Sequence, residues 1–268
     1  MNVARRKRIV RLGGSEINLG DFYLTDFICP NCFATDQVIW EAWSKLMEFY
    51  KRDPSTFVCL MNKIGLYNMY VKEIWNVINV KVKYRFDDPV FQVPDFWLLP
   101  NETWKQLKGD CEDTTFLLLS SVLRVKHGWE SGDDVAKEAV EYGCIGYYID
   151  HQGNAFGHGF CIRKSCRIAG GKWLWVETTL EDEVPQAIWY LVDFNQLIPV
   201  YFFTNRECYR IDKDYAKLGL TKDYVTQHQD LINQMIDYVE TGKWLKVKWM
   251  HKTRRPVDTR RITAIHIA

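Results

Sequence analysis

Three residues in the middle of the chain have the types and the order that a cysteine hydrolase needs: Cys111, His158 and Glu177. A thiol attacks as its thiolate, an imidazole can take and return the proton, and a carboxylate can hold the imidazole in one tautomer. Each of these residue types is common on its own. Their order along the chain predicts acyl transfer through a thioester, with Cys111 as the nucleophile, His158 as the base and Glu177 as the group that orients it.

The sequence around Cys111 favours a reactive thiol. Gly-Asp-Cys-Glu-Asp (residues 109–113) directly precedes an apolar helical pattern, so we expect Cys111 in the first turn of a helix. Free backbone N–H groups and the positive end of the helix dipole lower the pKa of a thiol there. Asp110, Glu112 and Asp113 oppose this effect, so a cation, normally an imidazolium, would be needed. The same acids also suit a helix N-terminus as caps, which is a purely structural role.

The elements that must position these residues begin with helices. Three prolines within residues 81–100 predict an extended connection into the segment that carries Cys111. Apolar residues at helical spacing, together with end signals such as Gly128 and Gly242, predict helices over residues 36–52, 55–78, 111–126, 133–142 and 221–240.

Aromatic and β-branched runs predict strands after the nucleophile helix, over residues 145–149, 157–163, 172–178 and 197–203, with an edge strand over 244–250. Strands that follow a central helix predict an α+β fold, in which the nucleophile helix packs on an antiparallel sheet. We divide the chain into a helical N-terminal region (1–94), a catalytic core (95–210), and a C-terminal helix with a basic tail (211–268).

The register between two of these strands decides whether His158 and Glu177 meet. They stand directly opposite each other if the chain reverses between residues 167 and 168, which predicts a longer loop over residues 165–170. A two-residue turn at Gly170 and Gly171 would instead put Glu177 opposite Lys164. A tight hairpin would therefore count against the triad.

The chain resembles the bacterial transglutaminase-like cysteine proteinases, a branch of the transglutaminase-like superfamily. The resemblance covers about a third of the chain: Asp-Phe-Trp-Leu-Leu-Pro-Asn-Glu at 95–102, Gly-Asp-Cys-Glu-Asp at 109–113, and the segments around His158 and Glu177. It implies a papain-like core, a thiolate at Cys111 paired with His158, and hydrolysis or transfer at a peptide or side-chain amide. Some relatives bind calcium through acids beside the nucleophile, which would point to Asp110 and Glu112. The mechanism itself requires no cofactor.

Two features depart from the family pattern. The family usually has an aspartate where this chain has Glu177, whose longer side chain needs its strand set back by about one methylene. The best known relatives act in the periplasm, whereas no apolar segment of the secretory kind follows the basic cluster at residues 5–11. We therefore expect a cytoplasmic or virion-associated protein.

An oxyanion formed at the site would be stabilised by the backbone N–H of Cys111 and one upstream side chain. Gln106 and Trp104 are the candidates by position. A surface glutamine and a core tryptophan are their structural alternatives.

Cys29 and Cys32, in Cys-Pro-Asn-Cys, have the spacing of a redox pair or of half a zinc site. Cys161 and Cys166 would have to complete such a site, although their spacing is not a standard second half and no histidine is suitably close. Ordinary thiols are favoured over zinc or a local disulfide.

The composition excludes several classes of protein. The 268 residues are 47% hydrophobic and 26% charged, close to the average of folded domains. No apolar run approaches the roughly 20 residues that span a bilayer, so we expect no membrane partner. The net charge of +1 argues against nucleic acid as a partner. The basic stretches at 5–11 and 243–261 are solvated termini or arms that bind a protein assembly partner.

Two functions from different classes remain. The first is a cysteine peptidase or amidase acting on a protein or peptide, which becomes a transglutaminase if an amine resolves the thioester. The second is a non-enzymatic structural or assembly protein, for example of a virus, that retains the fold. A contact between Cys111 and His158 in an open groove favours the enzyme, and a buried Cys111 favours the second function. The substrate, the oligomeric state, and a role of the N-terminal region as lid or propeptide stay open.

Overall fold

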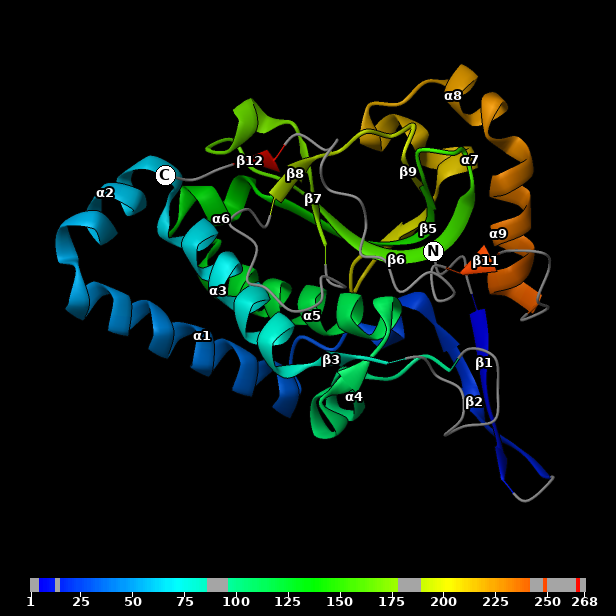
Figure 1. Cartoon of the computed structure of the whole chain (residues 1–268), viewed down its shortest axis with the longest axis horizontal. Coiled ribbons are helices and arrows are strands. Elements are labelled where there is room, and N and C mark those ends of the chain that lie inside the picture. The colour runs from blue at the N-terminus through cyan, green and yellow to red at the C-terminus, as the bar shows by residue number, and fades with distance from the viewer. Residues whose placement is uncertain are drawn as a thin grey trace.

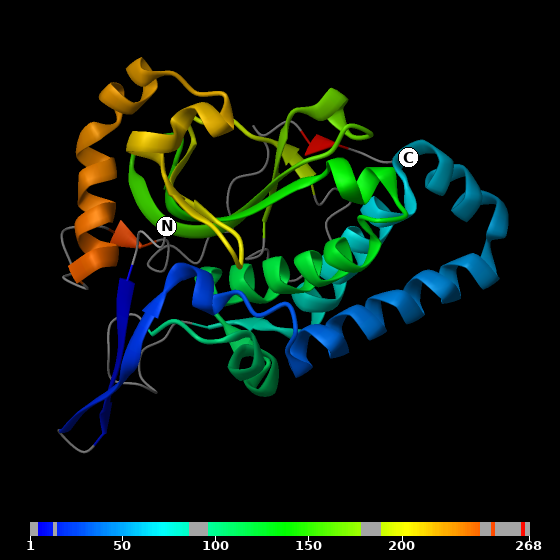
Figure 2. The ribbon, with the colours of Figure 1, turned by 180° about the vertical axis from the view of Figure 1, so that it is seen from behind.

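Helix α5 (Cys111–Trp129) lies at the centre of the computed structural model, which describes residues 5–12, 15–85, 96–177, 189–241, 248–249 and 264–265. Its side chains from Cys111 to Leu123 are buried on all sides, as expected of a helix with neighbours around it. Strands contact it on one side and helices on the other (Figures 1 and 2). These neighbours are β5 (Val140–Ile149), β6 (Ala155–Lys164), α1 (Phe33–Arg52), α3 (Leu66–Lys81) and α4 (Pro100–Gln106).

The main sheet has the strand order β10-β9-β5-β6-β7-β8-β12, and its neighbours along this path are antiparallel. Strand β9 is buried along its whole length, which explains its continuous apolar sequence. The α+β class expected from the sequence, with the nucleophile helix on an antiparallel sheet, is confirmed. Besides β5 and β6, the strands of this sheet are β7 (Trp173–Val176), β8 (Trp189–Leu191), β9 (Leu197–Phe203), β10 (Cys208–Arg210), β11 (Lys248–Trp249) and β12 (Ala264–Ile265).

A β-hairpin, which the sequence analysis did not predict, precedes the N-terminal helices. Strands β1 (Arg5–Leu12) and β2 (Ser15–Tyr23) pair with each other and extend away from the rest of the ribbon (Figures 1 and 2). Arg8 ties the hairpin to the body, because its guanidinium lies 2.7 Å from the Glu102 carboxylate and over the rings of Phe22 and Phe96. The region expected to be helical therefore begins with strands.

The helix predicted over residues 36–52 is confirmed as α1, but the one predicted over 55–78 is divided at Gly65 into α2 (Pro54–Ile64) and α3. Gly65 has a φ of 86°, and a Cβ there would lie 2.9 Å from a methyl group of Val135. Val135 belongs to α6 (Asp134–Glu138), which therefore packs directly against the break. Sequence periodicity contains no information about that neighbour.

Three further boundaries differ from expectation. Helix α5 continues through Gly128 instead of ending there. The helix predicted over 133–142 is only α6, because β5 begins at Val140 and the Glu141 carboxylate binds buried partners. The late helix is divided at His228. Its two parts are α8 (Lys222–Gln227) and α9 (Gln229–Thr241), preceded by the short α7 (Ile211–Asp214).

The C-terminal edge strand was predicted over residues 244–250, of which all but 248–249 lie outside the described residues. Residues 248–249 form β11, which pairs in parallel with β6. The buried apolar side chains form one cluster from Leu24 to Val239, so the three parts expected from the sequence share a core. Of the helices in the described ranges, none combines the length and the apolarity needed to cross a bilayer.

Candidate active site

Cys111 is the first residue of α5, as its sequence predicted. Asp110 is the N-cap: its carboxylate accepts from the Asp113 backbone N–H, and the Asp113 carboxylate accepts from the Asp110 N–H. Asp113 also accepts from the backbone N–H of Leu98 at 2.7 Å. Two of the three acids beside the nucleophile therefore have the capping role that the sequence offered as their structural alternative.

Strand β6 passes against the start of α5 at Gly159. A Cβ on Gly159 would lie 2.8 Å from the Cα and 2.9 Å from the backbone nitrogen of Glu112, so only glycine fits there. The Gly159 backbone acts to lower the pKa of the Cys111 thiol. This close approach brings Cys111 next to the residue that follows His158.

We expect Gly159→Ala to lower the free energy of unfolding by about 1–3 kcal/mol, because the added carbon meets backbone atoms that cannot rotate away. Thermal unfolding measures the change. Gly128→Ala is the matched control: nothing lies within 4 Å of a Cβ at Gly128, in the last turn of α5, so it should leave stability unchanged or raise it. Equal melting temperatures for Gly159→Ala and wild type would show that the close approach is not tight.

His158 and Glu177 form a buried pair. The imidazole Nε2 lies 3.2 Å from a carboxylate oxygen of Glu177, and both side chains are 0% exposed. The other ring nitrogen, Nδ1, is buried and makes no hydrogen bond to any described residue. The ring stacks on Phe160 and meets the edge of Trp175. The pair fixes the orientation of the imidazole and leaves Nδ1 for a further partner.

The longer loop predicted between these strands is present, but the register differs from the expected one. Strands β6 and β7 pair Cys161 with Val176 and Lys164 with Trp173. Extending this register by one residue puts Glu177 opposite Phe160, two residues from His158 and on the same face of the sheet. The two side chains therefore meet diagonally.

The surroundings keep the Cys111 thiol protonated. Burial raises its pKa well above the ordinary 9.0, and the charges of Glu112 and Asp110 raise it further, while the Gly159 backbone acts in the opposite direction. The thiol donates to a Glu112 carboxylate oxygen at 2.9 Å, and Cys111 is only 1% exposed. The electrostatic opposition expected from the neighbouring acids is thus present, and burial adds to it.

Two residues near the site were missed by sequence reasoning. Tyr84 reaches it through a two-residue parallel pair: β3 (Lys83–Tyr84) lies beside β4 (Lys108–Gly109), with Tyr84 opposite Gly109. Burial and then the charges of Cys111 and Asp110 raise the pKa of the Tyr84 phenol. From α3, the Trp75 indole N–H donates to the Glu177 carbonyl. No periodic pattern marks so short a pairing or so distant a contact.

The oxyanion candidates Gln106 and Trp104 lie on α4. Gln106 is exposed, and the Trp104 ring has the Lys81 ammonium 5.4 Å from its centre. Within the described ranges no hydrogen bond joins either side chain to Cys111. An oxyanion role for either residue stays a prediction.

The described residues contain no group of three or more His, Cys, Asp or Glu side chains that could hold a metal ion. Asp110 accepts from the Asp113 N–H and one oxygen of Glu112 accepts from the Cys111 thiol, while the other Glu112 oxygen makes no hydrogen bond to a described residue. Calcium at these two acids stays a prediction. By the same finding, Cys29 and Cys32 have no further zinc ligands beside them among the described residues.

All eight cysteines are free thiols in the structure. Cys29 donates to the Asp26 carbonyl, and burial, followed by the charge of Cys32, raises its pKa to about 11. A thiol with such a pKa is a poor nucleophile at neutral pH.

No protein-family model matches the chain, and no curated protein matches it. Three solved structures of LapG from Legionella pneumophila resemble it distantly. The first is 18% identical, with a TM-score of 0.38, and covers 75% of this chain and 97% of LapG. The calcium-bound form is 16% identical, with a TM-score of 0.35, and the match covers 69% of this chain and 98% of LapG. The EGTA-treated form is also 16% identical, with a TM-score of 0.38, and the match covers 75% of this chain and 97% of LapG.

Proposed function

We propose that the chain is a cysteine peptidase or amidase that uses Cys111, His158 and Glu177 on a protein or peptide substrate. The observation that carries the proposal is the buried His158–Glu177 pair beside Cys111. The hydrogen bond to Glu177 uses Nε2 of His158, and Nδ1 has no described partner. The next residue, Gly159, packs against the start of α5, where Cys111 lies. A thiol at a helix start, an imidazole with one free nitrogen and an orienting carboxylate are the groups that acyl transfer needs.

In the proposed reaction the thiol proton moves to His158 Nδ1 as the sulfur attacks the amide carbon and forms a C–S bond. The imidazolium then gives this proton to the departing amine as the C–N bond breaks, which leaves a thioester on Cys111. A water molecule gives its proton to the imidazole and attacks the thioester carbon. The C–S bond then breaks, the acid leaves, and the imidazolium returns the proton to the Cys111 sulfur. An amine in place of water would give transamidation. Glu177 stays ionised throughout and stabilises the imidazolium.

Glu112 opposes the first step of this reaction. Its carboxylate accepts from the thiol and stabilises the protonated form, and it acts together with burial. Formation of the thiolate therefore needs either the loss of this hydrogen bond or proton transfer to His158. Calcium at Asp110 and Glu112, which the family resemblance implied, is kept as a separate proposal, and no step is drawn through it.

The rate of Cys111 alkylation by iodoacetamide between pH 5 and 10 tests the site. Because Glu112 raises the pKa of the thiol, we expect Glu112→Gln to shift the alkylation profile to lower pH and to speed the reaction at neutral pH. His158→Ala should slow the reaction at neutral pH, since it removes the group that takes the proton. Mass spectrometry of digested protein scores each cysteine separately.

The exposed thiol of Cys59 is the internal control, and its rate should be the same in all variants. An unchanged profile for Cys111 in both variants would contradict the proposed site. Calcium has its own readout, since 1 mM CaCl₂ should raise the melting temperature of wild type more than that of Glu112→Gln if the two acids bind it.

A non-enzymatic assembly protein is the second candidate function. It is favoured by the burial of Cys111, which is 1% exposed and whose thiol pKa is raised mainly by that burial. The alkylation experiment separates the two candidates, because an assembly protein has no reason to couple the reactivity of Cys111 to His158.

A further inference from the structure

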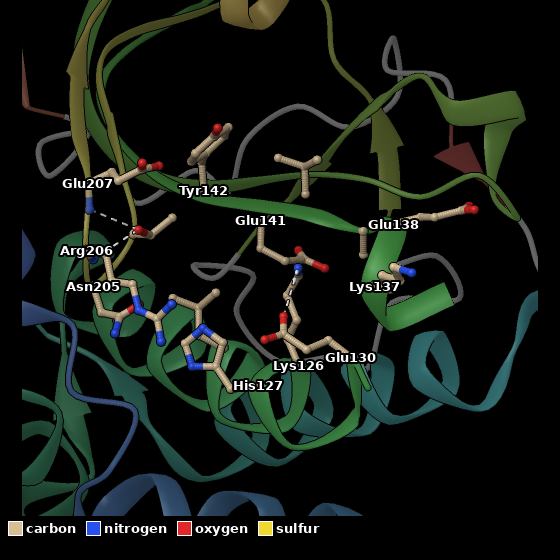
Figure 3. A pocket seen from close by; sticks show the side chains of 14 residues that line it. Lys126, His127, Glu130, Lys137, Glu138, Glu141, Tyr142, Asn205, Arg206 and Glu207 are labelled. Atoms are coloured by element: carbon tan, nitrogen blue, oxygen red, sulfur yellow. Dashed lines mark hydrogen bonds and ion pairs between the residues drawn. The ribbon is translucent and has the colours of Figure 1, made fainter. Parts of the chain in front are cut away.

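A pocket of about 430 Å³ lies at the opposite end of α5 from Cys111. Figure 3 shows the side chains that line it. It is enclosed by the last turns of α5, residues 137–139, the start of β5, and the turn over residues 204–207. At 1.5 Å per residue, the 16 residues from Cys111 to His127 span about 24 Å. The volume falls in the range of small-molecule sites, and the distance makes the pocket independent of the proposed active site.

One end of the pocket is basic. Figure 3 shows Arg206 and Asn205, from the turn between β9 and β10, close to His127 of α5. The hydroxyl of Thr204 accepts from the backbone N–H groups of Arg206 and Glu207 and fixes the shape of this turn. Burial and then the charge of Arg206 lower the pKa of His127. The guanidinium and the imidazole therefore lie within electrostatic reach of each other.

The charge of Arg206 is not neutralised inside the pocket. Among the described residues its guanidinium makes no ion pair and no hydrogen bond. The acids that line the pocket have other partners: Glu130 with Lys126, Glu138 with Cys166, Glu141 with Arg163, and Glu207 with Tyr209. An exposed arginine alone would mean little, but here it faces a concave site together with a second nitrogen donor.

We propose that this pocket binds a small organic molecule through a single carboxylate, held by Arg206 and His127. A guanidinium presents two parallel N–H groups that match the two oxygens of a carboxylate. Leu123 and Val140 offer an apolar wall for the rest of the ligand. Four glutamates and three cations (Lys126, Lys137 and Arg206) line the pocket, so it holds no surplus of positive charge for a dianion. This balance favours a monoanion over a phosphate.

The test is a titration of the full chain with small acids and amides. Binding is monitored through the side-chain NMR signals of His127. Benzoate represents a free acid and N-acetylphenylalanine the C-terminus of a peptide; benzamide and N-acetylphenylalaninamide are their neutral counterparts. We expect at least one acid to shift the His127 signals and neither amide to do so. Arg206→Ala should weaken acid binding at least tenfold, and Arg206→Lys less than that.

Arg52→Ala is the matched control, because Arg52 is also exposed and lies at the end of α1, outside the pocket. Which acid binds more tightly distinguishes a free ligand from a peptide end. The proposal is overturned if neither acid binds, if the amides bind equally well, if inorganic phosphate binds more tightly than both acids, or if Arg206→Ala and Arg52→Ala bind alike. Because Cys111 takes no part, failure here leaves the proposed hydrolase untouched.

Discussion

Cys111→Ala is expected to lower the proposed amide hydrolysis at least about a thousandfold, because it removes the thiol that we propose as the nucleophile. His158→Ala should give a loss of similar size, since the thiol and the imidazole act as one unit. The assay is digestion of a mixed peptide library, with new termini identified by mass spectrometry. Such a library reveals cleavage at any sequence that the site accepts.

Cys59→Ala is the control for this experiment, because Cys59 is an exposed thiol on α2, remote in sequence from the site. It should cleave the same bonds at the wild-type rate. Cleavage that persists in Cys111→Ala would assign the activity to another group or to a contaminant. Cleavage that is lost in Cys111→Ala but retained in His158→Ala would support Cys111 as the nucleophile and contradict His158 as the base.

Arg163→Ala is expected to lower the free energy of unfolding by about 3–5 kcal/mol, because it leaves a buried carboxylate without its cation. Arg163 is 1% exposed and lies 3.0 Å from the Glu141 carboxylate and 2.7 Å from the Asn68 side-chain oxygen. Its guanidinium also lies over the rings of Tyr67 and Trp189. Chemical denaturation measures the change.

The exposed ion pair of Arg124 and Asp36 gives the matched control. Arg124→Ala should change stability by no more than about 1 kcal/mol, as is usual for surface pairs. The double variant Arg163→Met with Glu141→Leu should be more stable than Arg163→Ala, because it removes both buried charges. Equal effects of Arg163→Ala and Arg124→Ala would mean that the buried pair contributes no more than a surface pair.

The elements that the sequence predicted well are those whose own pattern determines them. Helix α1 has apolar residues at helical spacing, and β9 is a continuous apolar run. The errors occur where the chain departs from its local pattern: the helix is interrupted at Gly65, which packs against Val135, and Glu141 lies in β5 with buried partners. A local pattern cannot report such partners.

In the candidate site, too, the residues found from the sequence are those with a local pattern. Cys111 was found because it stands in a helix-start motif, and His158 and Glu177 because they fall on consecutive strands. The diagonal contact between the latter two was not predicted, since the register depends on the loop between β6 and β7. Tyr84 was missed because a parallel pair of two residues leaves no pattern in the sequence.

The hydrogen bond from the Trp75 indole to the Glu177 carbonyl joins α3 to the strand end that carries the orienting carboxylate. Partial unfolding that releases α3 must break this hydrogen bond, so we expect the N-terminal helices to be energetically coupled to the position of Glu177. By thermodynamic linkage, a ligand that tightens the site would slow amide hydrogen exchange in α3, far away in sequence. The N-terminal helices would thus report on occupancy of a site to which they contribute no proposed catalytic residue.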